Sequence, residues 1–389
     1  MKIFAEELRR DPYRTYEELH RGGSNVVHMD DLGFSMVLDY EGVKRGLVDT
    51  DAFSSDLTTS RGNVFEWMVF MDPPRHTQVR AIVGRAFTPR SIAALEGKVR
   101  ELSATLADQL VAAGSGEVDL VAGFSMPLPM LVITHMMGLP HEDWQRLGAW
   151  AEAILRLVDK ILQEGALTAV QAFDAVQAEI GAYLDAHIAE RQRRPTDDLL
   201  TRLVQAEVDG ARLTRRELLH FFELLIVAGT ETTMNLISNT IICLTEHPAE
   251  LARLRADPAL VPTAVEETLR YRSPVQAIFR IARRTMELGG REIPAGRFVL
   301  LMIGAANRDR SQFSDPDRYD VGRSPNPHLA FGQGIHFCIG APLSRLEGQI
   351  AIPDLLKRMA TFELVSPSWP PHAAFHIHGP LSLPIRFTT

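Results

Sequence analysis

Cysteine is scarce in this chain of 389 residues, which contains only Cys243 and Cys338. Two cysteines are too few for a disulfide-stabilised scaffold and suit a reducing compartment, so we expect a cytoplasmic location. Cys243 lies within the apolar run 241–244, where a packed core thiol is the ordinary interpretation. Cys338 instead lies in a segment rich in glycine, which is not typical of a core residue.

Other features are also missing, and each absence excludes a class of protein. The formal net charge is −8, which argues against a general nucleic-acid partner. No uncharged apolar run reaches about 18 residues, so we expect no membrane span. The chain turns acidic at Glu6 and Glu7, unlike a secretory signal. No repeat or linker divides the chain, so we expect one domain over residues 1–389 and a monomer.

Helical periodicity dominates the chain, and strand-like patterns are confined to three regions. Residues 91–210 read as helices separated by short breaks, and residues 213–247 read as one very long helix. Strand patterns fall at about residues 26–40, 275–303 and 373–388. The fold class predicted is therefore mainly α with a smaller β region.

The segment Phe331-Gly-Gln-Gly-Ile-His-Phe-Cys-Ile-Gly340 precedes a helix-like run that starts near Pro342. Glycines allow a tight backbone path, and a cysteine before a helix N-terminus meets the positive end of the helix dipole. Both effects favour a thiolate held against a flat or metal-bearing partner. A dinucleotide-binding loop is excluded because Phe337 occupies the place of the third glycine.

The middle of the long helix contains the run Ala228-Gly-Thr-Glu-Thr-Thr233. Glycine and β-branched alcohols are poor helix formers, and a buried Glu231 would need a partner. One interpretation is that the threonine hydroxyls bond back to the preceding turn and bend the helix. The other is a notch for a small ligand, lined by an acid and alcohols that move protons.

Two further segments carry spaced charges. In Asp72-Pro-Pro-Arg-His-Thr-Gln-Val-Arg80, Asp72 is a plausible helix cap, and His76 and Arg80 share a helix face. Such a pair is either a solvated face or an anion site. Glu267 and Arg270 are three residues apart on a helix expected at 262–272, where an exposed pair would matter little.

Together these motifs resemble the cytochromes P450, most closely the soluble bacterial type. The matching patterns are Phe-x-x-Gly-x-His-x-Cys-x-Gly, Ala-Gly-x-(Asp/Glu)-Thr-Thr, Glu-x-x-Arg and Asp-Pro-Pro-x-His-Thr-x-x-Arg, and they occur in family order. The resemblance implies a mainly helical triangular prism. It also implies haem b between the long central helix and the helix after the cysteine loop, with Cys338 as the axial ligand of the iron.

The resemblance further implies roles for individual residues. Thr232 and Glu231 would be catalytic and would deliver protons to dioxygen. The residues expected to bind the cofactor are His76, Arg80, Ala228, Gly229, Arg280, Phe331, His336, Cys338 and Gly340. Glu267 and Arg270 would brace the haem-binding core, and either Arg318 or Arg323 would complete that brace.

Apolar residues in three places suggest a pocket for a small hydrophobic substrate. The segment 53–71 is either a loop folded over a cavity or a loop pinned to the core, and 149–173 would form a lid. His372, His376 and His378 lack a neighbouring acid or cysteine, so we expect no metal there, and His378 would lie near the roof of the pocket. The residues expected to line the pocket are Phe65, Trp67, Met68, Val69, Leu225, Val275, Ile278 and His378.

We expect this chain to carry no flavin or nicotinamide domain of its own. A monooxygenase of this family would use O2 and receive electrons from a separate ferredoxin and ferredoxin reductase, with NAD(P)H acting only through those partners. The arginines that could form a basic docking face are Arg75, Arg85, Arg283, Arg284, Arg308 and Arg345. Two alternatives remain: a peroxygenase of the same fold, or a haem protein that binds a ligand without catalysis.

Overall fold

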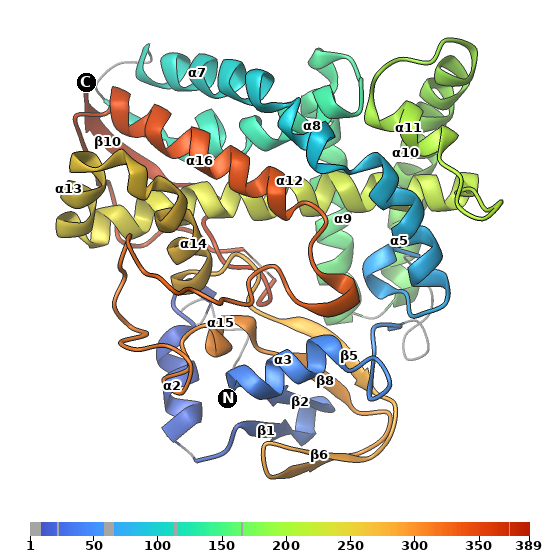
Figure 1. The fold of residues 1–389 in the computed structure, drawn as a ribbon, viewed down its shortest axis with the longest axis horizontal. Helices are drawn as coiled ribbons and strands as arrows, with labels where there is room; N and C mark the ends of the chain where they lie inside the picture. Colours follow the sequence, from blue (N-terminus) through green and yellow to red (C-terminus); the bar gives the residue numbers. More distant parts are fainter. Residues whose placement is uncertain (1–8, 22, 58–65, 113–115, 165, 373) are drawn as a thin grey trace. The chain divides into compact units, whose positions relative to one another are not determined.

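The computed structural model describes residues 9–21, 23–57, 66–112, 116–164, 166–372 and 374–389, with the side chains of 158–173 left aside. Within it the chain divides into two compact units. The sheet-containing unit consists of Met1–Ser55, Ser103–Ser125 and Thr232–Thr389, and the helical unit of Asp56–Leu102 and Met126–Glu231. Figure 1 shows the path of the chain through both units.

The sheet-containing unit holds all the strands that the structure describes. They are β1 (Val26–Met29), β2 (Phe34–Val37), β3 (Phe53–Ser54), β4 (Glu117–Asp119), β5 (Ile278–Ala282), β6 (Met286–Leu288), β7 (Arg291–Ile293), β8 (Phe298–Leu301), β9 (Thr361–Leu364) and β10 (Pro384–Thr388). Its helices are α2 (Tyr13–Arg21), α3 (Tyr40–Val48), α13 (Pro248–Ala256), α14 (Val261–Tyr271), α15 (Ile303–Ala306) and α16 (Ala341–Arg358), with helical turns η1 (Asp30–Leu32), η3 (Val121–Ser125), η5 (Pro258–Leu260) and η6 (Gly334–His336).

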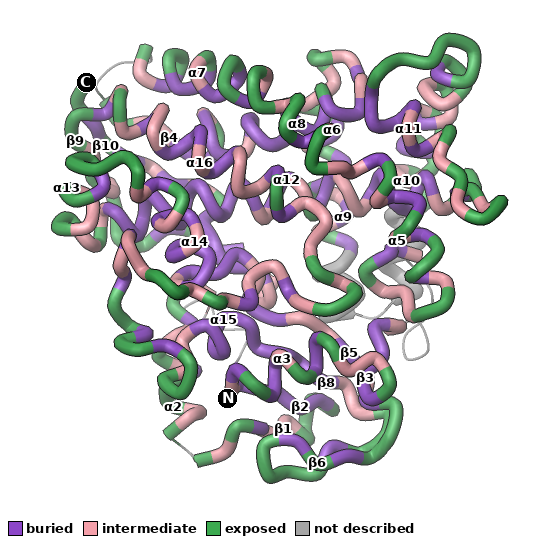
Figure 2. The backbone as a smooth tube through the Cα atoms, in the orientation of Figure 1, coloured by how far each residue is buried: buried purple, intermediate pink, exposed green. Residues whose placement is uncertain are grey.

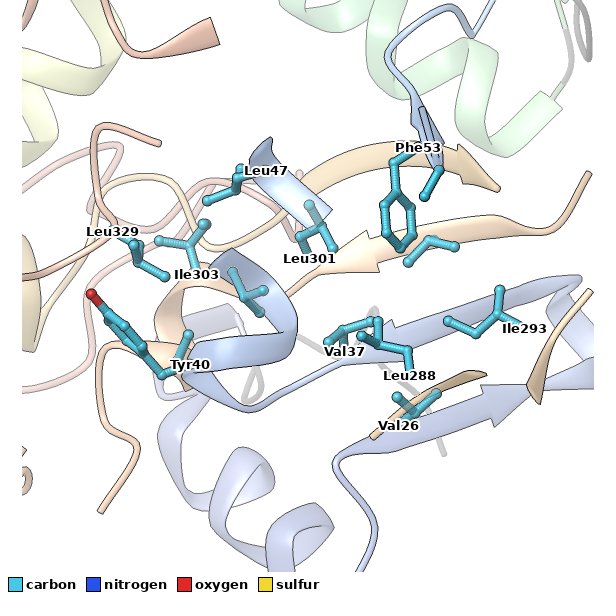
Figure 3. Packing of buried hydrophobic residues seen from close by; sticks show 14 of the residues in the cluster. Val26, Val37, Tyr40, Leu47, Phe53, Leu288, Ile293, Leu301, Ile303 and Leu329 are labelled. Carbon is cyan, nitrogen blue, oxygen red and sulfur yellow. The ribbon is translucent and has the colours of Figure 1, made fainter. Parts of the chain in front are cut away.

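The largest sheet has the strand order β1-β2-β8-β5-β3, and β2 and β8 run parallel while the other pairs are antiparallel. Side chains alternate between the two faces of a strand, and here both faces are covered. On β8, Val299 and Leu301 point into one apolar cluster with α3, whereas Leu300 points into another with α2. Figure 3 shows the first cluster, in which Tyr40 and Leu47 of α3 lie over the sheet.

Leu329 belongs to this same cluster and lies two residues before the cysteine segment. Burying a leucine-sized side chain stabilises a fold by about 1.5–3 kcal/mol. The start of the cysteine segment is therefore anchored to the sheet through apolar contacts. Arg280 on β5 is paired with Val299 in the register, which also places it on this part of the sheet.

The amino-terminal helix α2 is attached partly through a stacked guanidinium. The Arg308 Cζ atom lies 3.8 Å from the ring centres of both Tyr13 and Tyr271. Arg308 also donates to the backbone carbonyl of Tyr271 at 2.8 Å. Burial raises the pKa of Tyr13 to about 12, although Arg308 acts against this shift.

The helix α12 (Arg215–Glu246) supplies its first half to the helical unit and its second half to the sheet-containing unit. Thr214 and Glu217 form the expected capping box, in which Thr214 N–H donates to Glu217 Oε2 at 2.9 Å. The helix ends before Pro248, which begins α13. Every residue from 233 to 244 is buried, as the purple colouring of this part in Figure 2 shows.

Helices and helical turns connected by short loops make up the described part of the helical unit. They are α5 (Arg75–Ala86), α6 (Pro89–Ala93), the first turns of α7 (Glu96–Ala112), α8 (Pro127–Met136), α9 (Trp144–Glu164), α10 (Ala166–Arg193), α11 (Leu199–Gln205) and the first half of α12, with turns η2 (Met68–Phe70) and η4 (His141–Asp143). In the part of the chain that the structure describes, no helix is long and apolar enough to cross a membrane.

Most elements predicted from the sequence are confirmed, with four corrections. Strands β3, β4 and β9 lie outside the three regions in which strands are expected. Asp72 is not the N-cap residue of α5; Pro74 holds that position, and the helix begins at Arg75. The strand expected from Val275 begins only at Ile278, and Val275 itself forms an isolated bridge with Ile377. The proposed docking residue Arg308 is engaged inside the fold, as described above.

Candidate functional site

The segment 331–340 forms a tight loop at the head of α16. Gly332 and Gly334 adopt φ values of 69° and 70°, a region that favours glycine. A Cβ added at Gly334 would come 3.1 Å from the backbone oxygen of Leu47, so close approach to α3 also requires glycine. The Cys338 N–H donates to the Phe331 oxygen at 2.9 Å and closes the loop.

Cys338 is half-buried and precedes α16, with Gly340 as the N-cap and Pro342 in the first turn. Proline is tolerated there because the first N–H groups of a helix have no partner within it. The same unpaired N–H groups and the helix dipole favour a negative charge at this end. The local fold therefore suits a Cys338 thiolate.

A buried ion network lies behind the loop that leads to Cys338. Glu267 and Arg270 on α14 are fully buried, and Arg270 donates to both carboxylate oxygens of Glu267 at 2.8 Å. Arg323 adds a further contact to Glu267 Oε1 at 3.0 Å. Arg318 offers only its backbone oxygen to the two arginines. The structure thus decides between the two candidates in favour of Arg323.

One stripe of α12 is left uncovered although the helix is mostly buried. Leu225, Gly229 and Thr232 are partly exposed and Ala228 is exposed, at the i, i+3, i+4 and i+7 spacing of a single face. The intervening Ile226 is completely buried. This face therefore combines partial exposure with the two small residues Ala228 and Gly229.

The neighbouring threonines distinguish Thr232 from the other alcohols in the run. The Thr230 hydroxyl donates to the sulfur of Met130 at 3.8 Å, and the Thr233 hydroxyl donates to Ser344 at 3.2 Å. Thr230 and Thr233 are thus turned towards α8 and α16, and Thr232 remains on the uncovered face. Glu231 is buried. Gly229 allows close packing, since a Cβ there would come 2.6 Å from Ile133 Cδ1.

In the sheet-containing unit, three predicted site residues come near the cysteine loop or its sheet. A Cβ added at Gly332 would lie 4.0 Å from the Ile278 side chain on β5. Arg280 is buried on the same strand. The His336 ring nitrogen Nε2 lies 2.9 Å from the hydroxyl of Ser55.

In the helical unit, His76 is buried and Arg80 half-buried on one face of α5. Trp67 and Met68 are buried in the segment before α5, whereas Val69 is exposed. Phe65 lies outside the described residues. This segment is tied to α12, because the Trp67 ring N–H donates to the buried Glu223 carboxylate at 3.5 Å.

Comparison with known proteins decides the family. The family model described as Cytochrome P450 matches residues 7–368. The chain belongs to the cytochrome P450 family. It is 38% identical over 355 residues to a putative cytochrome P450, YjiB, of Bacillus subtilis, covering 91% of this chain and 89% of that protein.

Other relatives agree over nearly the whole length of this P450. It is 38% identical to the cytochrome P450 monooxygenase PikC of Streptomyces venezuelae, covering 98% of this chain and 92% of that protein. The structure of the cytochrome P450 CYP109Q5 from Chondromyces apiculatus matches with a TM-score of 0.89 and 39% identity, covering 100% of this chain and 98% of that chain. The mainly helical fold with small sheets is that of the bacterial P450s.

Membership of the family implies a haem-thiolate cofactor, and residues of this P450 fit that group. A single thiol stands at a helix N-terminus, in a loop that two left-handed glycines shape. The stripe on α12 is partly exposed and includes the small residues Ala228 and Gly229, which would leave room for a flat ligand. Buried Arg280 can balance carboxylate charge of the kind that haem carries.

His378 lies where a packing role explains it. The side chain is 1% exposed, its ring is 5.7 Å from the Tyr13 ring and 5.9 Å from the Trp369 ring, and Nδ1 contacts the Arg9 oxygen at 3.0 Å. Burial lowers the pKa of His378 to about 3, and nearby Arg272 adds to this effect. These surroundings favour a packing role for His378 over a place in the substrate pocket.

Three residues beside the cysteine loop escape prediction from the sequence. Glu266 on α14, His328 before the loop and Arg345 on α16 are linked by contacts of 2.7–3.0 Å. Burial alone would raise the pKa of Glu266, but the bonds from Arg345 and His328 outweigh it and lower the pKa to about 2. The three positions lie far apart in sequence, so no local spacing reveals them.

A second buried acid in the helical unit was also unexpected. Glu223 on α12 is completely buried and accepts from Gln177 of α10 at 3.0 Å. The ring of His220 lies 3.0 Å from its other oxygen. An acid at the i+3 position after a histidine is the only sequence signal, and on its own it is common.

Proposed function

We propose that this P450 is a haem-thiolate monooxygenase that transfers one oxygen atom from O2 to a small hydrophobic organic substrate by hydroxylation or epoxidation. Hydroxylation consumes a substrate C–H bond, O2, two electrons and two protons, and it yields an alcohol and water. The observation that carries the proposal is Cys338 in its glycine-shaped loop at the head of α16. Relatives named as a monooxygenase, an epoxidase and a hydroxylase support the reaction class.

Cys338 would hold the cofactor through its sulfur, and Phe331, His336 and Gly340 would shape the loop around that sulfur. Bound haem would supply the activation of dioxygen and the transfer of one oxygen atom. His76, Arg80 and Arg280 would bind its carboxylates. Ala228 and Gly229 would leave room for it along α12, since a larger side chain would fill the uncovered stripe.

Glu231 and Thr232 would manage protons at the uncovered face of α12. The Thr232 hydroxyl can donate a hydrogen bond to dioxygen and receive a proton in return. The adjacent Glu231 carboxyl can exchange protons with solvent and replenish that hydroxyl.

Trp67, Met68, Val69, Leu225, Val275 and Ile278 would contribute to the substrate pocket, along with Phe65. Their side chains are apolar, which favours a hydrophobic substrate without fixing its skeleton. One similar protein, CYP109E1 from Bacillus megaterium, has been solved in complex with testosterone and with corticosterone. Another, P450BioI, has been solved in complex with an acyl carrier protein that carries a fatty acid. Steroids and fatty acyl chains are accordingly the first classes to test.

Electrons would come from a ferredoxin and its reductase. Some arginines proposed for docking are already engaged: Arg345 pairs with Glu266, and Arg75 contacts Glu217. Arg283 and Arg284 are exposed, and they are the docking residues that we propose. Peroxygenase activity is the alternative that the acid–alcohol pair argues against.

The decisive experiment compares Cys338→Ser with Cys243→Ala as a matched control. The reduced carbon monoxide complex of the wild-type protein should show the absorption band of a thiolate-ligated haem. The C338S protein should lose that band and the C243A protein should keep it. Retention of the band in C338S would contradict the assigned ligand.

Turnover then separates the reaction classes. We expect product with NADH, a surrogate ferredoxin and its reductase, and little product with hydrogen peroxide alone. The reverse result would favour a peroxygenase. A ligand-binding protein would be favoured if compounds that shift the haem spin state gave no product under either condition. Screening steroids and fatty acids for such a shift would identify the substrate class.

A further inference from the structure

The back of the cysteine loop is supported by a cluster of three polar side chains, which we name the Glu266 cluster: Glu266, His328 and Arg345. Arg345 Nε and Nη2 donate to the two oxygens of Glu266 at 2.7 and 2.8 Å, a two-pronged contact that fixes the plane of the guanidinium. The side chains of Glu266 and Arg345 are 26% and 33% exposed, so water screens them only in part.

His328 completes the Glu266 cluster in its neutral form. The Ala330 N–H donates to His328 Nδ1 at 3.2 Å, so this nitrogen must be an acceptor. The proton then resides on Nε2, which donates to Glu266 Oε2 at 3.0 Å. One carboxylate and one guanidinium remain as charges, and the cluster is neutral overall.

The Glu266 cluster meets the cysteine loop through Phe331. The Arg345 Cζ atom lies 4.5 Å from the centre of the Phe331 ring, which is a cation–π contact. The Phe331 carbonyl accepts from Cys338 N–H at 2.9 Å. The pKa of Arg345 is raised by its hydrogen bonds to Glu266 and, more weakly, by the charge that Cys338 can carry. Arg345 is thus linked to the loop by contact and by charge.

We propose that Arg345, oriented by Glu266 and His328, is a positioning residue that sets the reduction potential of the cofactor at Cys338. This inference rests on the proposed haem-thiolate function. Reduction adds one electron beside a thiolate, and a nearby positive charge favours that addition. The carboxylate of Glu266 opposes it, so the observed pair holds the potential at an intermediate value.

Two single variants should shift the potential in opposite directions. Arg345→Gln leaves an uncompensated carboxylate and should disfavour reduction by about tenfold, which is about 59 mV for one electron. Glu266→Gln leaves an uncompensated guanidinium and should favour reduction by a similar factor. The double variant restores neutrality and should lie near the wild type.

The measurement is a potentiometric titration of the haem-loaded proteins, followed by absorption. Arg386→Gln and Glu363→Gln form the matched control, because this pair is also in contact at 3.0 Å but joins the neighbouring strands β10 and β9 through exposed side chains. Both control variants should keep the wild-type potential.

Opposite shifts in R345Q and E266Q, cancelled in the double variant, would support the proposal. Equal potentials, or shifts of the same sign, would overturn it and leave the Glu266 cluster a structural brace. Arg345→Lys keeps the charge without the two-pronged contact, so a potential as low as that of R345Q would also overturn the electrostatic argument. If R345Q fails to bind haem, the sign of the E266Q shift still decides.

Failure of the proposed function would be visible separately. The carbon monoxide spectrum of the wild-type protein reports thiolate ligation before any potential is measured. A wild type with that spectrum but without opposite shifts refutes only the role of the Glu266 cluster.

Discussion

Replacing Arg323 with glutamine removes one of the two cations that hold the buried carboxylate of Glu267. The lost contacts are the 3.0 Å ion pair to Glu267 and hydrogen bonds to three backbone carbonyls at 2.8–3.1 Å. Glu267 would keep both hydrogen bonds from Arg270. A hydrogen bond to a charged group contributes about 1.5–3 kcal/mol. We therefore expect R323Q to lower the free energy of unfolding by about 2 kcal/mol.

Two comparison variants should change the free energy of unfolding by less and by more than R323Q does: Arg318→Gln and Arg270→Gln. Arg318 is exposed and supplies the network with a backbone carbonyl that the substitution leaves in place, so R318Q should stay within about 0.5 kcal/mol of the wild type. Arg270 is fully buried and makes both of the shortest contacts to Glu267, so R270Q should lose about 3–5 kcal/mol.

Urea unfolding followed by circular dichroism measures the three changes, with all proteins at the same cofactor loading because bound ligand stabilises the folded state. Equal destabilisation by R318Q and R323Q would refute the assignment of Arg323. If R323Q is as stable as the wild type, the contact between Arg323 and Glu267 does not stabilise the fold.

Three further predictions concern protons, pH and packing. Thr232→Ala should raise the peroxide released per NADH consumed and lower product, measured by coupled assays, and unchanged coupling with the true substrate would count against the proton relay. Hydrogen bonds from Arg345 and His328 outweigh burial and lower the pKa of Glu266 to about 2 in the folded protein, against about 4.3 in an unfolded chain. The stability that this group contributes is complete above about pH 4.3 and is lost as the pH falls toward 2. The difference in unfolding free energy between wild type and Glu266→Gln should therefore shrink over that window, and a constant difference would contradict the ion pairing. Gly379→Ala should destabilise the protein by about 1–3 kcal/mol, because the new Cβ would overlap the Asn235 side chain. Gly84→Ala lies in open space within α5 and should stabilise the protein by about 0.5–1 kcal/mol. Thermal unfolding measures both changes, and the opposite order of stability would show that the segment around Gly379 moves aside freely.

Features that local sequence determines could be predicted. The cysteine loop, the capping box at Thr214 and the extent of α12 depend on glycines, caps and prolines within a few residues of each other. The uncovered stripe on α12 follows from the same logic, since its small residues recur at helical spacing.

Features that depend on tertiary contacts could not be predicted. Arg318 and Arg323 read alike in sequence, and only the path of the irregular segment directs one side chain inward. The contacts of Glu266 with His328 and Arg345 join positions 62 and 79 residues away. His378 was placed near the pocket roof because sequence shows a polar side chain without showing the aromatic rings that enclose it.

Helix α2 makes two kinds of charged contact, and ionic strength acts differently on them. The pair Arg14–Glu18 has side chains 83% and 57% exposed, and salt at 0.1 M screens such charges beyond about 10 Å and weakens them at contact. The guanidinium of Arg308 is held between two ring faces, where dissolved ions do not enter. The amino-terminal helix is thus fastened in a way that tolerates salt, even though the charges on its outer side do not.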